Sequence, residues 1–283
     1  METHKLELQN AIDYERELHI QERAAATIAK YKHDVQYFFD WLKGSGAEAI
    51  TKDIVIAYKA ALVERYAPES VNSMLAAVNG FLAFMGWHEC RVKALKIQPN
   101  AYTDSDRELT REEYDRLVRA AKAKKDSRLA HLLQTICATG IRVSELPYIT
   151  VEAVAKGRAT VCNKGKTRVV FLTRLLCCRL KEYCKASRIR SGSVFVTSSG
   201  KPLNRSNIWA MMKALCTLAG VSARKVFPHN LRHLFARCFY KQEHDLDHLA
   251  AILGHSNINT TRVYTKTTGE EHRVQVERLA LVR

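Results

Sequence analysis

The sequence predicts a mainly α-helical protein of two domains, the second of which carries a small antiparallel β-sheet. In the first hundred residues, apolar side chains recur at three- and four-residue steps, which is the spacing of one face of a helix. After residue 108, short runs of strand-forming residues flank a glycine-containing turn, and further helical patterns follow. A chain of 283 residues is long enough for two separate cores.

Residues 1–98 are predicted to form a helical bundle. One helix has its apolar face between residues 27 and 42 and ends at the glycine- and serine-rich turn 43–46. A second helix is expected from Thr51 to Arg65, and a third from Pro68 to Gly86. The residues before the first of these faces are predicted to form another helix or a flexible arm. Together the apolar faces fit a small bundle.

Residues 99–108 are predicted to be a linker, because they lose the apolar periodicity and gather proline, asparagine, aspartate and serine. The second domain, residues 109–283, then opens with a capping box. Thr110 has the side chain of an N-cap, and Glu113 follows three residues later. A helix is therefore expected to begin at this point.

Strands are expected only in the second domain. Residues 159–162 and 168–172 flank the turn 163–166, which is typical of a hairpin. Residues 193–197 are predicted as a third short strand. The remaining predicted helices are 206–219, 228–241 and 246–253, followed by a capped helix start at Asn259-Thr260-Thr261.

The charge of the chain is unevenly placed. The net charge is +16, but the residues up to Asp104 hold 12 basic and 14 acidic side chains, and the remainder hold 33 and 15. A half this basic favours a polyanionic partner, most often nucleic acid. The alternative is a charge that serves solubility, which the one-sided distribution disfavours.

The composition gives no sign of a membrane or of secretion. No apolar run approaches the ~20 residues of a membrane span, and the first residues contain no apolar signal segment. The eight cysteines form no C-x-x-C pair or other zinc-ligand spacing. We therefore expect a cytoplasmic protein with reduced thiols.

Several side chains of the second domain are of the types that a nucleophilic attack on a phosphodiester requires. Tyr264 supplies a nucleophile, and Arg142 and Arg232 supply guanidinium groups that can grip a phosphate. His229 lies three residues before Arg232, near a predicted helix N-terminus that favours anions. His255 lies nine residues before Tyr264.

Each of these residues has a simpler explanation when taken alone. His229 and Arg232 fit a surface pair, and a lone tyrosine is usually a core or rim residue. Arg142 and Glu145 fit an exposed ion pair worth less than ~1 kcal/mol. The pairs His229…His233 and His244…His248 lack the glutamate of a zinc-protease motif, so both are predicted to be histidines on a helix face rather than metal ligands.

Three longer motifs, taken in order, resemble those of the tyrosine recombinases of the phage-integrase family, in its Xer-like and transposon-integrase branch. The resemblance covers residues 109–264, whereas the N-terminal helices are similar only in type to the family's core-binding domain. It implies a C-terminal α+β catalytic domain. The matching segments are 138–146, 228–233, 253–256 and 260–264.

The resemblance implies a role for each residue of the set. Arg142 and Arg232 would clamp the scissile phosphate, and Tyr264 would attack it to give a 3′-phosphotyrosyl link and a free 5′-hydroxyl. His229 matches the acid–base histidine, and His255 matches a histidine that hydrogen-bonds the phosphate. The implied function is site-specific DNA recombination in integration, excision or resolution of mobile DNA.

Two further residues follow from the resemblance. Lys164 matches the hairpin lysine that protonates the leaving oxygen, and Glu145 matches an acidic residue behind the first arginine. The hairpin Asn163-Lys164-Gly165-Lys166 is shorter than the family's pattern, so Lys166 is an alternative general acid.

The resemblance also implies what binds the chain. It implies double-stranded DNA as partner, no cofactor, no metal, and a homotetramer on two DNA sites assembled through the C-terminal tail. Two other functions stay open: a non-catalytic DNA-binding or architectural protein on the same scaffold, and DNA relaxation of the type IB topoisomerase kind.

Overall fold

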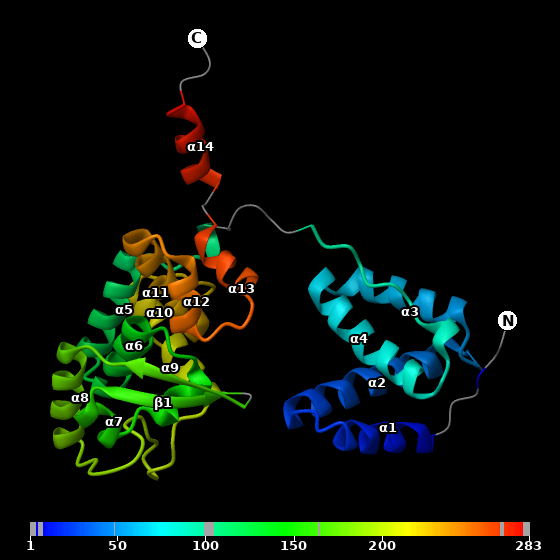
Figure 1. The fold of residues 1–283 in the computed structure, drawn as a ribbon, viewed down its shortest axis with the longest axis horizontal. Coiled ribbons are helices and arrows are strands. Elements are labelled where there is room, and N and C mark those ends of the chain that lie inside the picture. The colour runs from blue at the N-terminus through cyan, green and yellow to red at the C-terminus, as the bar shows by residue number, and fades with distance from the viewer. Residues whose placement is uncertain are drawn as a thin grey trace. The chain divides into compact units, whose positions relative to one another are not determined.

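The computed structural model describes residues 4, 8–47, 49–98, 105–163, 165–266 and 269–279. The chain divides into two compact units, Met1–Pro99 and Asn100–Arg283 (Figure 1). We call these the N-terminal and C-terminal units and describe each by itself. Among the described residues, no helix combines the length and the hydropathy that crossing a bilayer requires.

The N-terminal unit is helical, as predicted. Phe38, Phe39, Tyr58 and Phe81 lie fully buried at the centre of its core. Thr51 caps its helix by accepting a hydrogen bond from the backbone N–H of Ile54. Its elements are α1 (Leu8–Ile20), α2 (Ala25–Ser45), α3 (Lys52–Arg65), α4 (Pro68–Phe84) and the 3-10 helix η1 (His88–Cys90).

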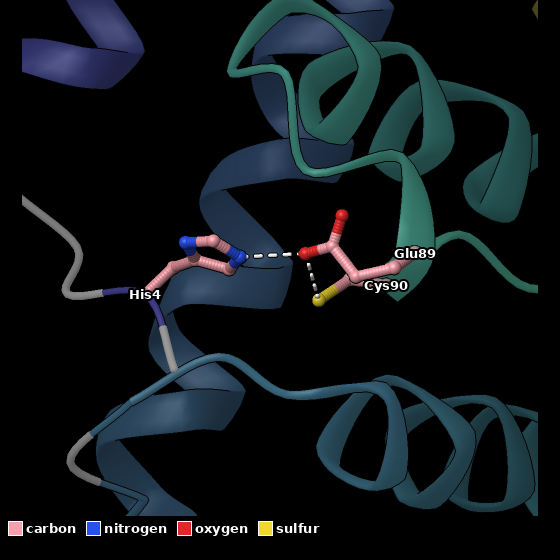
Figure 2. Close-up of side chains that lie close together, drawn as sticks. All are labelled: His4, Glu89 and Cys90. Carbon is pink, nitrogen blue, oxygen red and sulfur yellow. Dashed lines mark hydrogen bonds and ion pairs between the residues drawn. The ribbon is translucent and has the colours of Figure 1, made fainter. Parts of the chain in front are cut away.

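A contact between distant segments anchors His4 to this unit (Figure 2). Its backbone pairs with Ile50, its ring stacks on Trp87 at 4.6 Å, and its Nε2 lies 2.6 Å from Glu89 Oε1. Cys90 Sγ donates to the same carboxylate at 3.4 Å. Around a zinc ion, nitrogen and oxygen ligands each at about 2.0–2.2 Å would stand farther apart than 2.6 Å. The geometry is therefore that of a hydrogen-bonded anchor.

The C-terminal unit has a helical body and one hairpin. Most of its buried apolar residues form one cluster, which extends from Leu109 to Leu234. Thr110 and Glu113 form the predicted capping box at the start of α5. The elements up to the hairpin are η2 (Ser105–Arg107), α5 (Arg111–Ala123), α6 (Ser127–Thr139), η3 (Val143–Tyr148), α7 (Val151–Lys156), β1 (Arg158–Asn163) and β2 (Lys166–Phe171). The later elements are α8 (Arg174–Ala186), α9 (Arg205–Lys213), α10 (Cys216–Ala219), α11 (Pro228–Glu243), α12 (Leu246–Leu253), α13 (Asn259–Arg262), η4 (Val263–Thr265) and α14 (Gly269–Glu277).

The two strands pair antiparallel, in a register that joins Arg158 to Phe171 and Asn163 to Lys166. The turn between them therefore has two residues, of which Gly165 takes a φ of +74°. Lys164, the other, lies outside the described residues. In Figure 1 the hairpin lies at one side of the helical body of this unit.

Three local predictions were wrong. Residues 193–197 form no strand of the sheet, because Val194 and Phe195 are both buried and bond to different segments instead of alternating. The predicted helix 206–219 is two helices, α9 and α10, with a break at residues 214–215. α13 follows Ile258 without a side-chain cap, whereas a capped start had been expected.

Two side chains, of Phe235 and Leu253, lie close to the backbone of Gly140 at the end of α6. Gly140 ends α6 with a φ of +61°. A Cβ built there would lie 2.5 Å from Phe235 Cδ1 and 3.0 Å from Leu253 Cδ2. α11 and α12 therefore pack directly on the backbone that leads to Arg142, two residues further on.

We predict that Gly140→Ala lowers the free energy of unfolding by about 2–5 kcal/mol, since left-handed strain costs about 1–2 kcal/mol and overpacking about 1–3 kcal/mol. Gly157→Ala is the matched control, because Gly157 has a φ of +69° but open space around its Cβ. It should lose only the strain energy. Urea unfolding of both variants measures the difference, and equal losses would contradict the packing argument.

Candidate active site

Five residues that the sequence places far apart converge in the C-terminal unit. Arg142 precedes η3, His229 and Arg232 lie in the first turns of α11, His255 follows α12, and Tyr264 lies in η4. They meet because α11 packs against α6, α12 and η4, which brings three motifs to one place.

Arg232 is the buried centre of this group, with 1% of its surface exposed. Its guanidinium donates to Gly140 O at 2.6 Å, to Leu253 O at 2.8 Å and to His255 Nε2 at 3.0 Å. Burial is the main cause that lowers the pKa of Arg232 to about 10; the charge of Arg142 adds to this effect, and Tyr264 opposes it. None of these three hydrogen bonds goes to a carboxylate, so they leave the charge of Arg232 uncompensated.

Arg142 is held by a buried glutamate. Its Nη1 lies 3.0 Å from Glu145 Oε1, and its backbone N–H donates to Glu145 Oε2 at 2.9 Å. Burial alone would raise the pKa of Glu145, but the Arg142 N–H, the charge of Arg168 and the Arg142 guanidinium together hold that pKa below its ordinary value. The carboxylate is therefore ionised at neutral pH, while 30% of the Arg142 side chain stays exposed for an anion.

The hydrogen bonds of His255 determine its tautomer. An arginine can only donate, so Nε2 must accept from Arg232, and we assign the ring proton to Nδ1. Nδ1 then donates to the fully buried Thr261 Oγ1 at 2.9 Å. Burial, with the charges of Arg232 and Arg142, lowers the pKa of His255 to about 4, so the ring is neutral near pH 7.

Tyr264 is enclosed by imidazole rings. It is 4% exposed, with the His233 ring edge-on at 4.6 Å and the His255 ring stacked at 5.9 Å. The ring centroid of His229 lies 4.5 Å from that of His233. Burial is the main cause that lowers the pKa of His233 to about 3, and burial followed by the charge of Arg232 lowers that of His229. All these rings are neutral at pH 7, and both nitrogens of His255 are already engaged, with Arg232 and Thr261.

Arg142 lines two cavities. One, of about 660 Å³, is also lined by Glu145, Lys166 and His255. The other, of about 820 Å³, is lined by Arg142, His229 and Arg232. The hairpin residue Lys166 thus reaches the same cavity as the arginine and histidine motifs.

Comparison with known proteins identifies the family. The profile of the phage integrase family matches residues 107–271, and that of the phage integrase N-terminal SAM-like domain matches residues 11–89. The chain belongs to the phage integrase family. This result confirms the predicted family, and with it the predicted enzyme class, a tyrosine site-specific recombinase.

Relatives of this recombinase share most of its length. The tyrosine recombinase XerC of Roseiflexus castenholzii is 32% identical over 268 residues, covering 87% of this chain and 85% of its own. XerA of Thermococcus kodakarensis is 28% identical over 279 residues, covering 95% of both chains. The crystal structure of the XerH site-specific recombinase bound to its difH substrate, 20% identical, superimposes with a TM-score of 0.70 over 93% of this chain and 81% of its own, which supports the fold.

Three residues of the recombinase site were not expected from its sequence. His233, predicted to be a histidine on a helix face, contacts Tyr264; Thr261 bonds His255; Arg168 pairs with Glu145 at 2.7 Å. His233 directly follows Arg232, and Thr261 precedes Tyr264 by three residues, which are the signals that could have pointed to them.

We predict that His255 stays uncharged until the pH falls to about 4, with its proton on Nδ1. Thr261→Val removes the acceptor of that proton and should give a mixture of tautomers, whereas Thr260→Val, at the exposed neighbouring position, should not. Two-dimensional ¹⁵N NMR of the histidine rings across a pH titration distinguishes these states. Titration of His255 near 6.5 would refute the assignment.

Proposed function

We propose that this recombinase cleaves and rejoins DNA at specific sites with Tyr264 as its nucleophile. The observation that carries the proposal is the enclosure of the Tyr264 phenol by neutral imidazoles, beside a buried guanidinium. A phenol of ordinary pKa near 10 needs a proton acceptor or cationic neighbours to attack at neutral pH. A site that only bound DNA would need neither.

Arg142 and Arg232 are proposed to hold the scissile phosphate between them. Charge builds on the phosphate oxygens in the five-coordinate transition state, and fixed donors stabilise it most in a site that excludes water. The rigid hold on Arg232 and the partial exposure of Arg142 support this assignment. Glu145 would keep the Arg142 fork in place.

In the proposed reaction one bond to phosphorus forms as another breaks. Tyr264 Oη forms a bond to phosphorus, the bond from phosphorus to the 5′ oxygen breaks, and that oxygen takes a proton from the hairpin lysine. The phenol proton passes to His229. To hydrogen-bond the phosphate, His255 would have to take up a proton at Nε2 and release its bond from Arg232. Rejoining is the reverse attack by a 5′-hydroxyl on the phosphotyrosyl bond. That bond retains the free energy of the broken phosphodiester, so rejoining needs no nucleotide cofactor.

DNA is proposed to contact both units. The DNA-bound structures of XerH and of a lambda integrase dimer support this proposal, and the excess of basic residues after Asp104 supports a contact by the C-terminal unit. We propose residues 1–98 as the core-binding domain, 99–108 as the linker and 109–283 as the catalytic domain. The separate profile matches to residues 11–89 and 107–271 support that division.

Assembly is proposed to use the C-terminal tail. A strand exchange between two DNA sites requires four nucleophiles, hence a homotetramer. In α14 and the turn after it, Val276 and Leu279 are 50% and 60% exposed, so they offer apolar surface for a neighbouring copy.

We predict that a suicide duplex forms a covalent adduct with the protein and that Tyr264→Phe forms none, because the phenol oxygen is the attacking atom. Repeats flanking the coding gene supply candidate duplexes. The adduct is measured as a shifted band on a denaturing gel. Tyr240→Phe, which changes a partly buried tyrosine packed in the same cluster, should keep the adduct. An adduct in Tyr264→Phe would remove this residue from the role, and relaxation of any supercoiled plasmid would favour the topoisomerase alternative.

The hairpin lysine has a chemical test. A 5′-bridging phosphorothioate leaves as a thiolate, whose conjugate acid has a pKa of about 8.5, so it needs no general acid. We predict that Lys164→Ala cleaves normal DNA slowly and the phosphorothioate at close to the wild-type rate. Lys166→Ala should show no such recovery. Recovery by Lys166→Ala alone would transfer the role to Lys166.

A further inference from the structure

Arg168 lies at the junction of the segments that form the site. It projects from β2 with only 14% of its side chain exposed. Its Nη2 lies 2.7 Å from Glu145 Oε2, and its Nη1 donates to Ile252 O at 2.7 Å, near the end of α12. One side chain therefore joins the hairpin to two other elements.

Arg168 and Arg142 share one buried carboxylate. Glu145, 1% exposed, gives Oε1 to the Arg142 guanidinium, and gives Oε2 to Arg168 and to the Arg142 backbone. Two guanidinium groups and one carboxylate leave a net positive charge. Without Arg168, the charge of Glu145 would fall on Arg142 alone, and the pair would present no net charge to an anion.

The aliphatic part of the Arg168 side chain packs against the backbone at Gly254, the residue before His255. A Cβ on Gly254 would lie 2.6 Å from Arg168 Cδ, so the arginine passes through space that only a glycine leaves open. The Gly254 carbonyl also accepts from Arg142 Nη2 at 3.4 Å. The backbone just before His255 is thus held between two arginines.

We propose that Arg168 is a positioning residue of the recombination reaction: it neutralises Glu145, so that the charge of Arg142 remains available to the scissile phosphate. This inference rests on the proposed function of Arg142 as a phosphate clamp.

The test is a double-mutant cycle on single-turnover cleavage of the suicide duplex. Arg168→Met should slow cleavage at least tenfold while the affinity for DNA stays within about threefold, because many other basic residues bind the backbone. In a Glu145→Gln background no carboxylate needs neutralising. Adding Arg168→Met there should slow cleavage less than threefold further. If the rate effects of Arg168→Met and Glu145→Gln multiply in the double variant, the two residues contribute independently to cleavage, and the proposal is overturned.

Arg237 gives the matched control. It is a part-buried arginine of the same unit, paired with Glu108 and bonded to Leu109 O, with no contact to Glu145. Arg237→Met should lower the melting temperature, and its effect on cleavage should multiply with that of Glu145→Gln. A merely structural role for Arg168 would give the same multiplying pattern.

A second variant covers the case in which Arg168→Met does not fold. Arg168→Lys keeps the charge and loses the fork, so it should cleave within about tenfold of the wild type and couple to Glu145→Gln in the same direction. Absence of that coupling would also overturn the proposal. A wild-type protein that forms no adduct through Tyr264 would refute the proposed function instead, so the two failures are distinguishable.

Discussion

The site depends on one buried cation. Arg232 lies in the core of the C-terminal unit and donates to carbonyl oxygens at the ends of α6 and α12 and to His255. Helix C-termini carry partial negative charge and unpaired carbonyls, so they are suitable partners for a guanidinium that has left water. Because one rigid fork ties both helix ends together, the segments that follow them, which carry Arg142 and His255, are brought to the same side of the unit.

The same positive charge has a second effect, on protons. Burial lowers the pKa of both His255 and His229, and the charges of Arg232 and Arg142 lower both further. A group of arginines that can grip a phosphate therefore also keeps the neighbouring imidazoles in their basic form. Binding of an anion would weaken that effect and raise the proton affinity of the rings. Phosphate binding and proton uptake are thus coupled through the field of two side chains.

The sequence was sufficient where the signal is local or carried by a long motif. The helix start near Thr51, the capping box at Thr110 and the hairpin followed from periodicity, capping residues and turn residues. The motifs predicted the convergence of Arg142, Arg232 and Tyr264, although the roles of these residues remain predictions. Arg168 could not be found this way, because its partners come from other segments and a pattern along the chain carries no distance between segments. For His233 the one local signal was its place directly after Arg232. The strand predicted at 193–197 was wrong for a related reason: both faces of that run are buried.

Tyr264 does not belong to the main core. It packs with Ala236, Leu249 and Leu253 in a small separate cluster, and the short elements α13 and η4 carry it there. A cluster of this size can open locally at a much lower free energy than the whole unit needs to unfold. The fraction of molecules with the phenol in place is then set by a local equilibrium, which Arg232 also affects because it bonds Leu253 O and His255. Under the proposed role of Tyr264, contacts made to α12 or α13 would shift that population and so set how many molecules can react.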